Sequence, residues 1–166
     1  QGETITGLTI FWPDQGLDTG PVLLQKETVI GPDDTLGSLY FDKLFPMGVE
    51  AMVEAVEMVR QGTAPRIVQD ESQATYEGWC KAKDTIIDWS STGRDIYNLI
   101  RGTDPSPGAS TSLGRQKIQF YRTTLGTDEY VESPGTVTEV SDNGFVCRSV
   151  VAIYLCKGFS LRDHGK

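Results

Sequence analysis

Near the start of the chain, apolar and polar residues alternate in two short segments that flank a loop. Residues 7–12 carry Leu8, Ile10 and Trp12 at every second position and stop at Pro13, so they predict a strand. Residues 22–30 predict a second strand. The residues between them are rich in Asp, Gly and Pro, which form tight turns. The chain is therefore expected to open with a strand, a structured loop and a strand.

A long amphipathic helix is predicted next. Apolar residues recur at helical spacing from residue 36 to residue 59, after capping side chains at residues 33–35. Pro46 predicts a bend in this helix, and Gly62 predicts its end. An extended connector is expected to follow, from residue 64 to residue 70.

The second half of the chain is predicted to contain one short helix and several β segments. A short strand is expected at residues 85–89, followed by a helix that Ser91 or Thr92 caps and Gly102 ends. From residue 116 onward the pattern changes to short extended runs. Their ranges are 117–122, 136–140, 145–148 and 150–155. A small barrel or sandwich is the expected result.

Charge divides the chain into two parts and bears on its partners. The net charge is −8, but residues 1–73 hold four Lys or Arg against twelve Asp or Glu, whereas residues 74–166 hold eleven of each. An acidic first part repels a polyanion, and a neutral second part offers it no net attraction. Large RNA is therefore not the expected partner.

Neither a membrane span nor a metal site is predicted. No apolar run approaches the roughly 20 residues that cross a bilayer, and no leader pattern opens the chain. The three cysteines lack the Cys-x-x-Cys spacing of zinc or redox sites, so they are interpreted as reduced thiols. These observations favour a cytoplasmic protein without a structural metal.

The loop between the first two strands carries the chemical information. Asp18 lies between Gly16 and Gly20, which let the backbone approach a ligand closely. A carboxylate fixed in such a loop can orient a neighbouring imidazole and relay protons during attack on a carbonyl. The alternative is a turn carboxylate that satisfies the N–H groups of its own loop. Local chemistry leaves both interpretations open.

This part of the chain resembles the signature of the formyltransferase family, whose members use 10-formyltetrahydrofolate as cosubstrate. The runs at residues 6–11, 16–21 and 23–25 match that signature in order and spacing. The resemblance implies that Asp18 is catalytic and that its loop helps to hold the folate. The loop residues implicated in folate binding are Asp14, Gln15, Gly16 and Leu17.

The later part of the chain resembles the start of that family's carboxyl-terminal β-barrel domain, at residues 74–76, 87–89, 100–102 and 107–109. Ser110 stands where the family places a tryptophan. The expected fold class is α/β. Residues 1–72 are expected to be the trailing part of a Rossmann-like catalytic domain that exposes apolar surface, and residues 73–166 a small OB-like β-barrel.

The resemblance also places two further catalytic residues of the family, an asparagine and a histidine, upstream of residue 1. The chain is therefore expected to be a carboxyl-terminal piece that is inactive alone. His164, the single histidine, lies two residues from the end without an organised partner and is rejected as a substitute.

The formyl acceptor stays open between water, a small-molecule amine and initiator methionyl-tRNA. Residues 10–12, 44–46, 75–78 and 100–102 look nearer to the hydrolase domain of formyltetrahydrofolate dehydrogenase. Five basic residues form either a local patch for RNA or an ordinary solvated surface: Arg94, Arg101, Arg115, Lys117 and Arg122. A noncatalytic binding or structural module is the alternative from another class.

Overall fold

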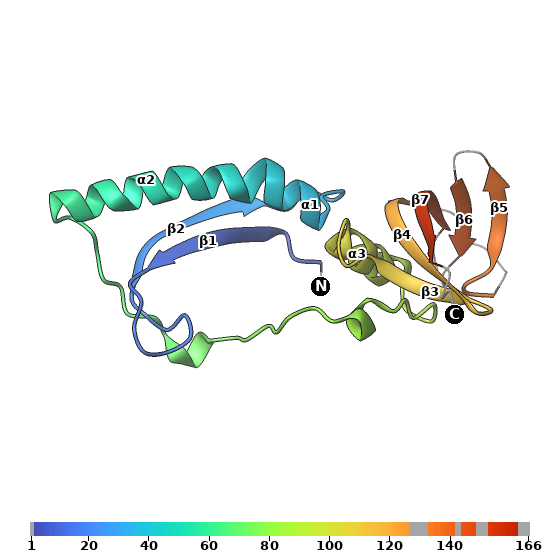
Figure 1. Ribbon diagram of the computed structural model, residues 1–166, viewed down its shortest axis with the longest axis horizontal. Helices are drawn as coiled ribbons and strands as arrows, with labels where there is room; N and C mark the ends of the chain where they lie inside the picture. Colours follow the sequence, from blue (N-terminus) through green and yellow to red (C-terminus); the bar gives the residue numbers. More distant parts are fainter. Residues whose placement is uncertain (1, 127–132, 142–143, 149–152, 163–166) are drawn as a thin grey trace. The chain divides into compact units, whose positions relative to one another are not determined.

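The computed structural model describes residues 2–126, 133–141, 144–148 and 153–162 (Figure 1). The chain separates into two compact units. The hairpin unit comprises residues 3–32 and 38–78, and the sheet unit comprises residues 1–2, 33–37 and 79–166. Both helices and strands are present, as the predicted α/β class requires.

The hairpin unit begins with two antiparallel strands, β1 (Ile5–Phe11) and β2 (Val22–Val29). Thr6 pairs with Thr28 and Ile10 with Leu24, and the register shifts at the last pair, next to the loop. This confirms the predicted strand, loop and strand. The alternation of side chains is visible in β2, where half-buried and exposed residues follow one another.

The helical segment that follows has three parts. A short α1 (Leu36–Ser38) leads into a π-helical stretch, η1 (Leu39–Leu44), and then into α2 (Phe45–Gln61). The π-helical stretch thus ends just before Pro46, and the bend predicted there stays a prediction. The helix ends as predicted, because Gly62 adopts a left-handed conformation with φ of 70° that few other residues accept.

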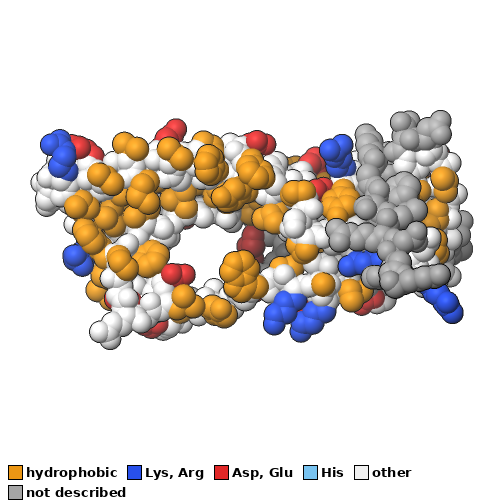
Figure 2. Space-filling model, in the orientation of Figure 1, with side chains coloured by type: hydrophobic (Ala, Val, Ile, Leu, Met, Phe, Trp, Pro, Cys, Tyr) orange, Lys and Arg blue, Asp and Glu red, His pale blue; other side chains and the backbone are white. Residues whose placement is uncertain are grey.

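Small residues let α2 lie close along the hairpin (Figure 1). Ala51 and Ala55 are the buried residues of this helix, and Lys26 of β2 forms a 2.6 Å ion pair with Glu54. Many larger apolar side chains of the helix remain exposed, and Figure 2 shows them gathered along it. They include Val49, Met52, Val53 and Val56. The predicted exposed apolar surface is thus present on this unit.

Two short 3₁₀ turns follow the helix, η2 (Glu71–Gln73) and η3 (Ala82–Thr85). The prediction of a regular strand at residues 85–89 is wrong. Only an isolated parallel bridge forms there, between Ile86 and Ser110, with the N–H of Ile87 donating to the Ser110 carbonyl at 2.8 Å. A single bridge is too short a pairing to make a strand.

The sheet unit packs one helix against a five-stranded antiparallel sheet. Thr92 caps α3 (Gly93–Thr103) by accepting a hydrogen bond from the Asp95 N–H, as the sequence predicted. The sheet has the order β3-β4-β7-β6-β5. Its strands are β3 (Ala109–Leu113), β4 (Gln116–Leu125), β5 (Val137–Ser141), β6 (Gly144–Arg148) and β7 (Ile153–Arg162). The pairings of the described residues do not join β3 to β5.

Aromatic rings form the centre of the sheet unit. Phe120 is 1% exposed and meets the rings of Trp89 and Phe145 edge to face, at centroid distances of 5.7 and 5.5 Å. Ile96 and Ile100 of α3 complete the same core. Over the described part of the chain, no helix is long and apolar enough to cross a membrane.

Candidate active site

The loop at residues 13–21 is closed at its base by backbone contacts. The N–H of Trp12 donates to the Pro21 carbonyl at 2.9 Å. Gly20 is buried against the Trp12 carbonyl, and a Cβ atom there would lie 1.7 Å from that oxygen. Only glycine allows the two chain segments to come this close. The loop therefore starts and ends at a fixed point.

Asp14 shapes the loop from inside. Its Oδ1 atom accepts hydrogen bonds from the Gly16 N–H at 2.9 Å and from the Thr19 hydroxyl at 2.7 Å. A Cβ atom at Gly16 would meet that hydroxyl at 2.0 Å. The space beside both glycines is thus filled by the loop itself. Asp14 uses one carboxylate oxygen to hold the turn, which is a common role of Asp in loops.

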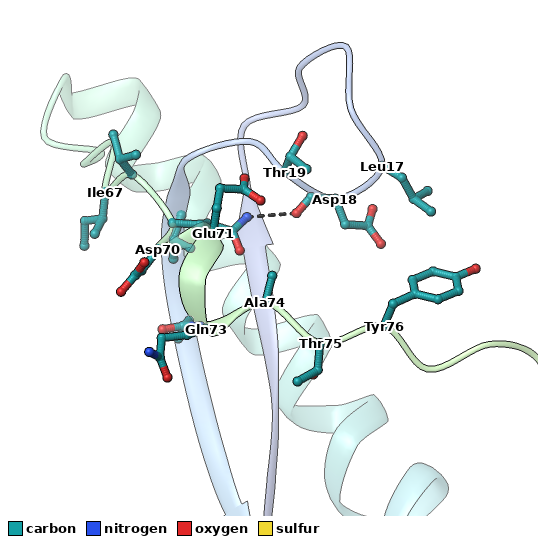
Figure 3. A pocket seen from close by; sticks show the side chains of 14 residues that line it. Leu17, Asp18, Thr19, Ile67, Asp70, Glu71, Gln73, Ala74, Thr75 and Tyr76 are labelled. Carbon is teal, nitrogen blue, oxygen red and sulfur yellow. Dashed lines mark hydrogen bonds between the residues drawn. The ribbon is translucent and has the colours of Figure 1, made fainter.

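Asp18 lies in the returning arm of this loop in a left-handed conformation, with φ of 56° (Figure 3). This region is sparsely populated by residues other than glycine, although Asp enters it more readily than most. Such a conformation persists where the surroundings hold it, and it is common at functional sites. Across the described residues, no hydrogen-bond donor contacts the Asp18 carboxylate, so this group remains available to a ligand or a partner side chain.

A cavity of about 550 Å³ lies beside the loop, entirely within the hairpin unit. Leu17, Asp18 and Thr19 form one wall, and the connector from Ile67 to Tyr76 forms the other (Figure 3). Val22 and Gln25 of β2 also line it. The volume falls within the range of about 300–1,000 Å³ that is typical of small-molecule sites.

Asp70, on the opposite wall of the cavity, has a carboxylate whose surroundings differ from those of the Asp18 carboxylate. Asp70 accepts hydrogen bonds from the Ser72 hydroxyl at 2.7 Å and from the Ser72 N–H at 3.0 Å. These two bonds hold the pKa of Asp70 below its ordinary value. Asp70 therefore caps the η2 turn as a fixed anion, whereas the Asp18 carboxylate faces the cavity without such bonds.

The connector is attached to the hairpin by three kinds of contact. Val22 and Ile67 exchange two backbone hydrogen bonds, of 2.7 and 3.0 Å. The indole N–H of Trp12 donates to the Pro65 carbonyl at 2.8 Å, and the guanidinium of Arg66 lies 4.1 Å from the Trp12 ring centroid. Residues 67–70 of the extended connector predicted from the sequence thus form part of a fixed wall of the cavity.

The structure distributes the predicted site residues unevenly. Leu17 and Asp18 line the cavity, whereas Asp14, Gln15 and Gly16 belong to the same loop but lie outside the cavity wall. Thr19 and the lining residues between Ile67 and Tyr76 were not among the site residues predicted from the sequence. Residues 74–76 had been assigned to the next domain. His164 lies outside the described residues.

Comparison with known proteins matches both parts of the chain to one family. The family model for formyl transferase matches residues 1–56, and the model for the formyl transferase carboxyl-terminal domain matches residues 80–151.

Among curated relatives, cytosolic 10-formyltetrahydrofolate dehydrogenase from Mus musculus is 48% identical over 130 residues, covering 78% of this chain and 14% of that protein. Methionyl-tRNA formyltransferase from Desulforamulus reducens is 33% identical over 162 residues, covering 97% of this chain and 51% of that protein. The chain thus spans about half the length of these relatives or less.

A solved structure supports the fold. HypX from Aquifex aeolicus, in complex with tetrahydrofolic acid, superposes with a TM-score of 0.75 at 20% identity, covering 93% of this chain and 27% of that one.

Proposed function

Because this chain belongs to the formyl transferase family, we propose that it is part of a one-carbon metabolism enzyme that transfers the formyl group of 10-formyltetrahydrofolate to water or to an amine. Asp18 is the catalytic residue of this proposal. The observation that carries it is the position of Asp18, on the wall of a cavity of ligand size and in a conformation that its loop maintains.

The chemistry requires a group that controls a proton beside the formyl carbon. The folate supplies the formyl group. Asp18 orients an imidazole that is contributed by polypeptide outside residues 1–166, and it stabilises the protonated form of that imidazole. In this way Asp18 assists the attack of water or an amine. Leu17 offers an exposed apolar side chain on the same wall for contact with the pterin ring. Asp14 and Gly16 serve the folate indirectly, by shaping the loop, and Gln15 lies between them.

Water is the acceptor that we favour. Identity to the dehydrogenase, at 48%, exceeds identity to the methionyl-tRNA formyltransferase, at 33%. The neutral charge of residues 74–166 agrees, because a tRNA-binding domain is normally basic. Two of the five basic residues are also engaged within the sheet unit. Arg101 donates to Asn98 and to the Asp34 carbonyl, and Arg94 lies over the Tyr97 ring.

The same proposal covers the architecture and location. Residues 1–72 form the trailing part of a Rossmann-like catalytic domain, and residues 73–166 form a small OB-like barrel. The α/β hairpin unit and the antiparallel sheet support this assignment. A cytoplasmic location is inferred from the cytosolic relative.

The test uses the natural polypeptide that contains residues 1–166, supplied with 10-formyltetrahydrofolate. Formate release reports water as acceptor, and formylated methionyl-tRNA reports the alternative. Asp18→Asn should lower turnover by about 10²–10⁴-fold, as expected for loss of a group that controls proton transfer. Asp70→Asn is the matched control, because Asp70 lines the same cavity but is bonded to Ser72. Equal turnover in both variants would contradict the assignment, and folate binding without turnover would favour a noncatalytic module.

A further inference from the structure

Gln69 connects the second wall of the cavity to the loop that carries Asp18. Its side-chain nitrogen donates to the Asp18 carbonyl at 2.8 Å and to the Gly20 carbonyl at 2.7 Å. Backbone carbonyls only accept, so this geometry fixes the side of the amide that carries the nitrogen. Both N–H groups of the amide are used. Figure 3 shows the bond to Asp18 as a dashed line.

The backbone around Gln69 is itself fixed. Two residues earlier, Ile67 exchanges backbone hydrogen bonds with Val22, at the start of β2. One residue later, Asp70 caps the η2 turn through Ser72. The Gln69 amide therefore extends from a rigid segment, and its two bonds impose a position on the loop.

The two carbonyls that Gln69 holds lie at two conformationally restricted positions of the loop. One belongs to Asp18, whose left-handed backbone is unfavourable for a residue with a side chain. The other belongs to Gly20, at the closed base of the loop. If Asp18 left its left-handed conformation, its carbonyl would lose the bond to Gln69. Because φ and ψ together fix the direction of the Cα–Cβ bond relative to the flanking chain, the same change would redirect the carboxylate.

We propose that Gln69 is a positioning residue for the reaction, which fixes the backbone of Asp18 so that its carboxylate is directed into the cavity. This inference rests on the proposed function of Asp18. Gln69 touches neither substrate nor reacting atoms in this role. It acts by limiting the loop to one of its conformations, which lowers the entropy that catalysis must otherwise overcome.

Two substitutions separate positioning from a purely structural role. Gln69→Glu keeps the shape of the side chain but replaces the nitrogen that makes both bonds with a carboxylate oxygen, which would face the two carbonyls. Gln69→Leu keeps similar volume without donors. Gln116→Glu is the matched control, because Gln116 is exposed, does not line the cavity, and the change adds the same charge.

The experiment measures kcat and KM for 10-formyltetrahydrofolate in the natural polypeptide, alongside hydrogen exchange of residues 13–22 and the urea unfolding midpoint. We expect Gln69→Glu and Gln69→Leu to lower kcat by about 10- to 100-fold, since each tenfold factor corresponds to the loss of about one good hydrogen bond. KM should stay within about twofold, because the carboxylate that Gln69 positions acts in the transition state rather than in substrate binding. Loop exchange should accelerate, while Gln116→Glu stays close to wild type.

The outcomes are separable from those of the proposed function. If Asp18→Asn abolishes turnover while both Gln69 variants keep full kcat, the positioning role is overturned and the role of Asp18 survives. If the Gln69 variants do not fold, Gln69 is structural and the inference fails. The same holds if their loss of kcat is fully accounted for by the fraction of unfolded protein that the urea midpoint gives. If Asp18→Asn keeps full turnover, both proposals fall together.

Discussion

Replacing Gly20 with alanine tests the closed base of the active-site loop. The new methyl group would lie 1.7 Å from the Trp12 carbonyl oxygen and 2.9 Å from its carbon. Because non-bonded carbon and oxygen atoms approach only to roughly 3.2–3.5 Å, the loop base must open by about 1.5 Å. That movement breaks the 2.9 Å bond from the Trp12 N–H to the Pro21 carbonyl.

The expected cost of Gly20→Ala is about 1–3 kcal/mol in the free energy of unfolding, as for other cases of overpacking. Gly48→Ala is the control in the same unit. A Cβ atom at Gly48 meets Leu8 Cδ2 at 3.6 Å, an ordinary contact, so this change in a helix should stabilise by about 0.5–1 kcal/mol.

Urea unfolding followed by circular dichroism measures both changes, provided that the slope with denaturant stays constant. Hydrogen exchange at the Trp12 amide should accelerate by about tenfold or more in Gly20→Ala, because its acceptor moves away. Equal unfolding midpoints for Gly20→Ala and wild type, with unchanged Trp12 exchange, would refute the close contact. Equal losses in both alanine variants would show that the effect is not specific to the loop.

Two further predictions concern the sheet unit. Phe120→Ala should lower the free energy of unfolding by about 3–5 kcal/mol, because it empties the centre of an aromatic core, whereas Val140→Ala, at a position 79% exposed, should change it by less than about 0.5 kcal/mol. Similar urea midpoints for the two variants would contradict the core. Burial and the 2.8 Å hydrogen bond to Asp33 raise the pKa of Tyr97 from 10.0 to about 12. The protonated form of Tyr97 is thus favoured in the folded state. Its contribution to the free energy of unfolding is fully present below pH 10 and is lost as the pH rises toward about 12. Tyr97→Phe should remove this alkaline loss in urea titrations, and an unchanged pH profile would refute it.

Local signals in the sequence predicted the elements that local chemistry specifies. Thr92 caps α3 and Gly62 ends α2, because each satisfies the backbone of its own helix terminus. By contrast, β3 was missed. Its sequence has three consecutive hydroxyl residues, Ser110 to Ser112, and it becomes a strand through pairing with β4. Strand formation there depends on a tertiary partner rather than on propensity.

The candidate site divides in the same way. The loop of Asp18 could be predicted from its Asp and Gly residues and from the family resemblance. The opposite wall could not, because Gln69 lies 51 residues further along the chain and nothing in its neighbourhood indicates its partners. Its role depends on the bridge between Val22 and Ile67, which the sequence pattern did not predict.

The segment from Asp33 to Gly37 belongs to the sheet unit, although the residues on both sides of it belong to the hairpin unit. It supplies the carboxylate that receives the Tyr97 hydroxyl, a carbonyl for Arg101, and the Gly37 N–H that donates to Asp104. A polypeptide cut near residue 78 would leave the carboxyl-terminal half without these groups. Independent expression of the carboxyl-terminal half therefore requires that the segment from Asp33 to Gly37 be attached to it. Without this segment, the buried Tyr97 hydroxyl would lose its hydrogen-bond acceptor.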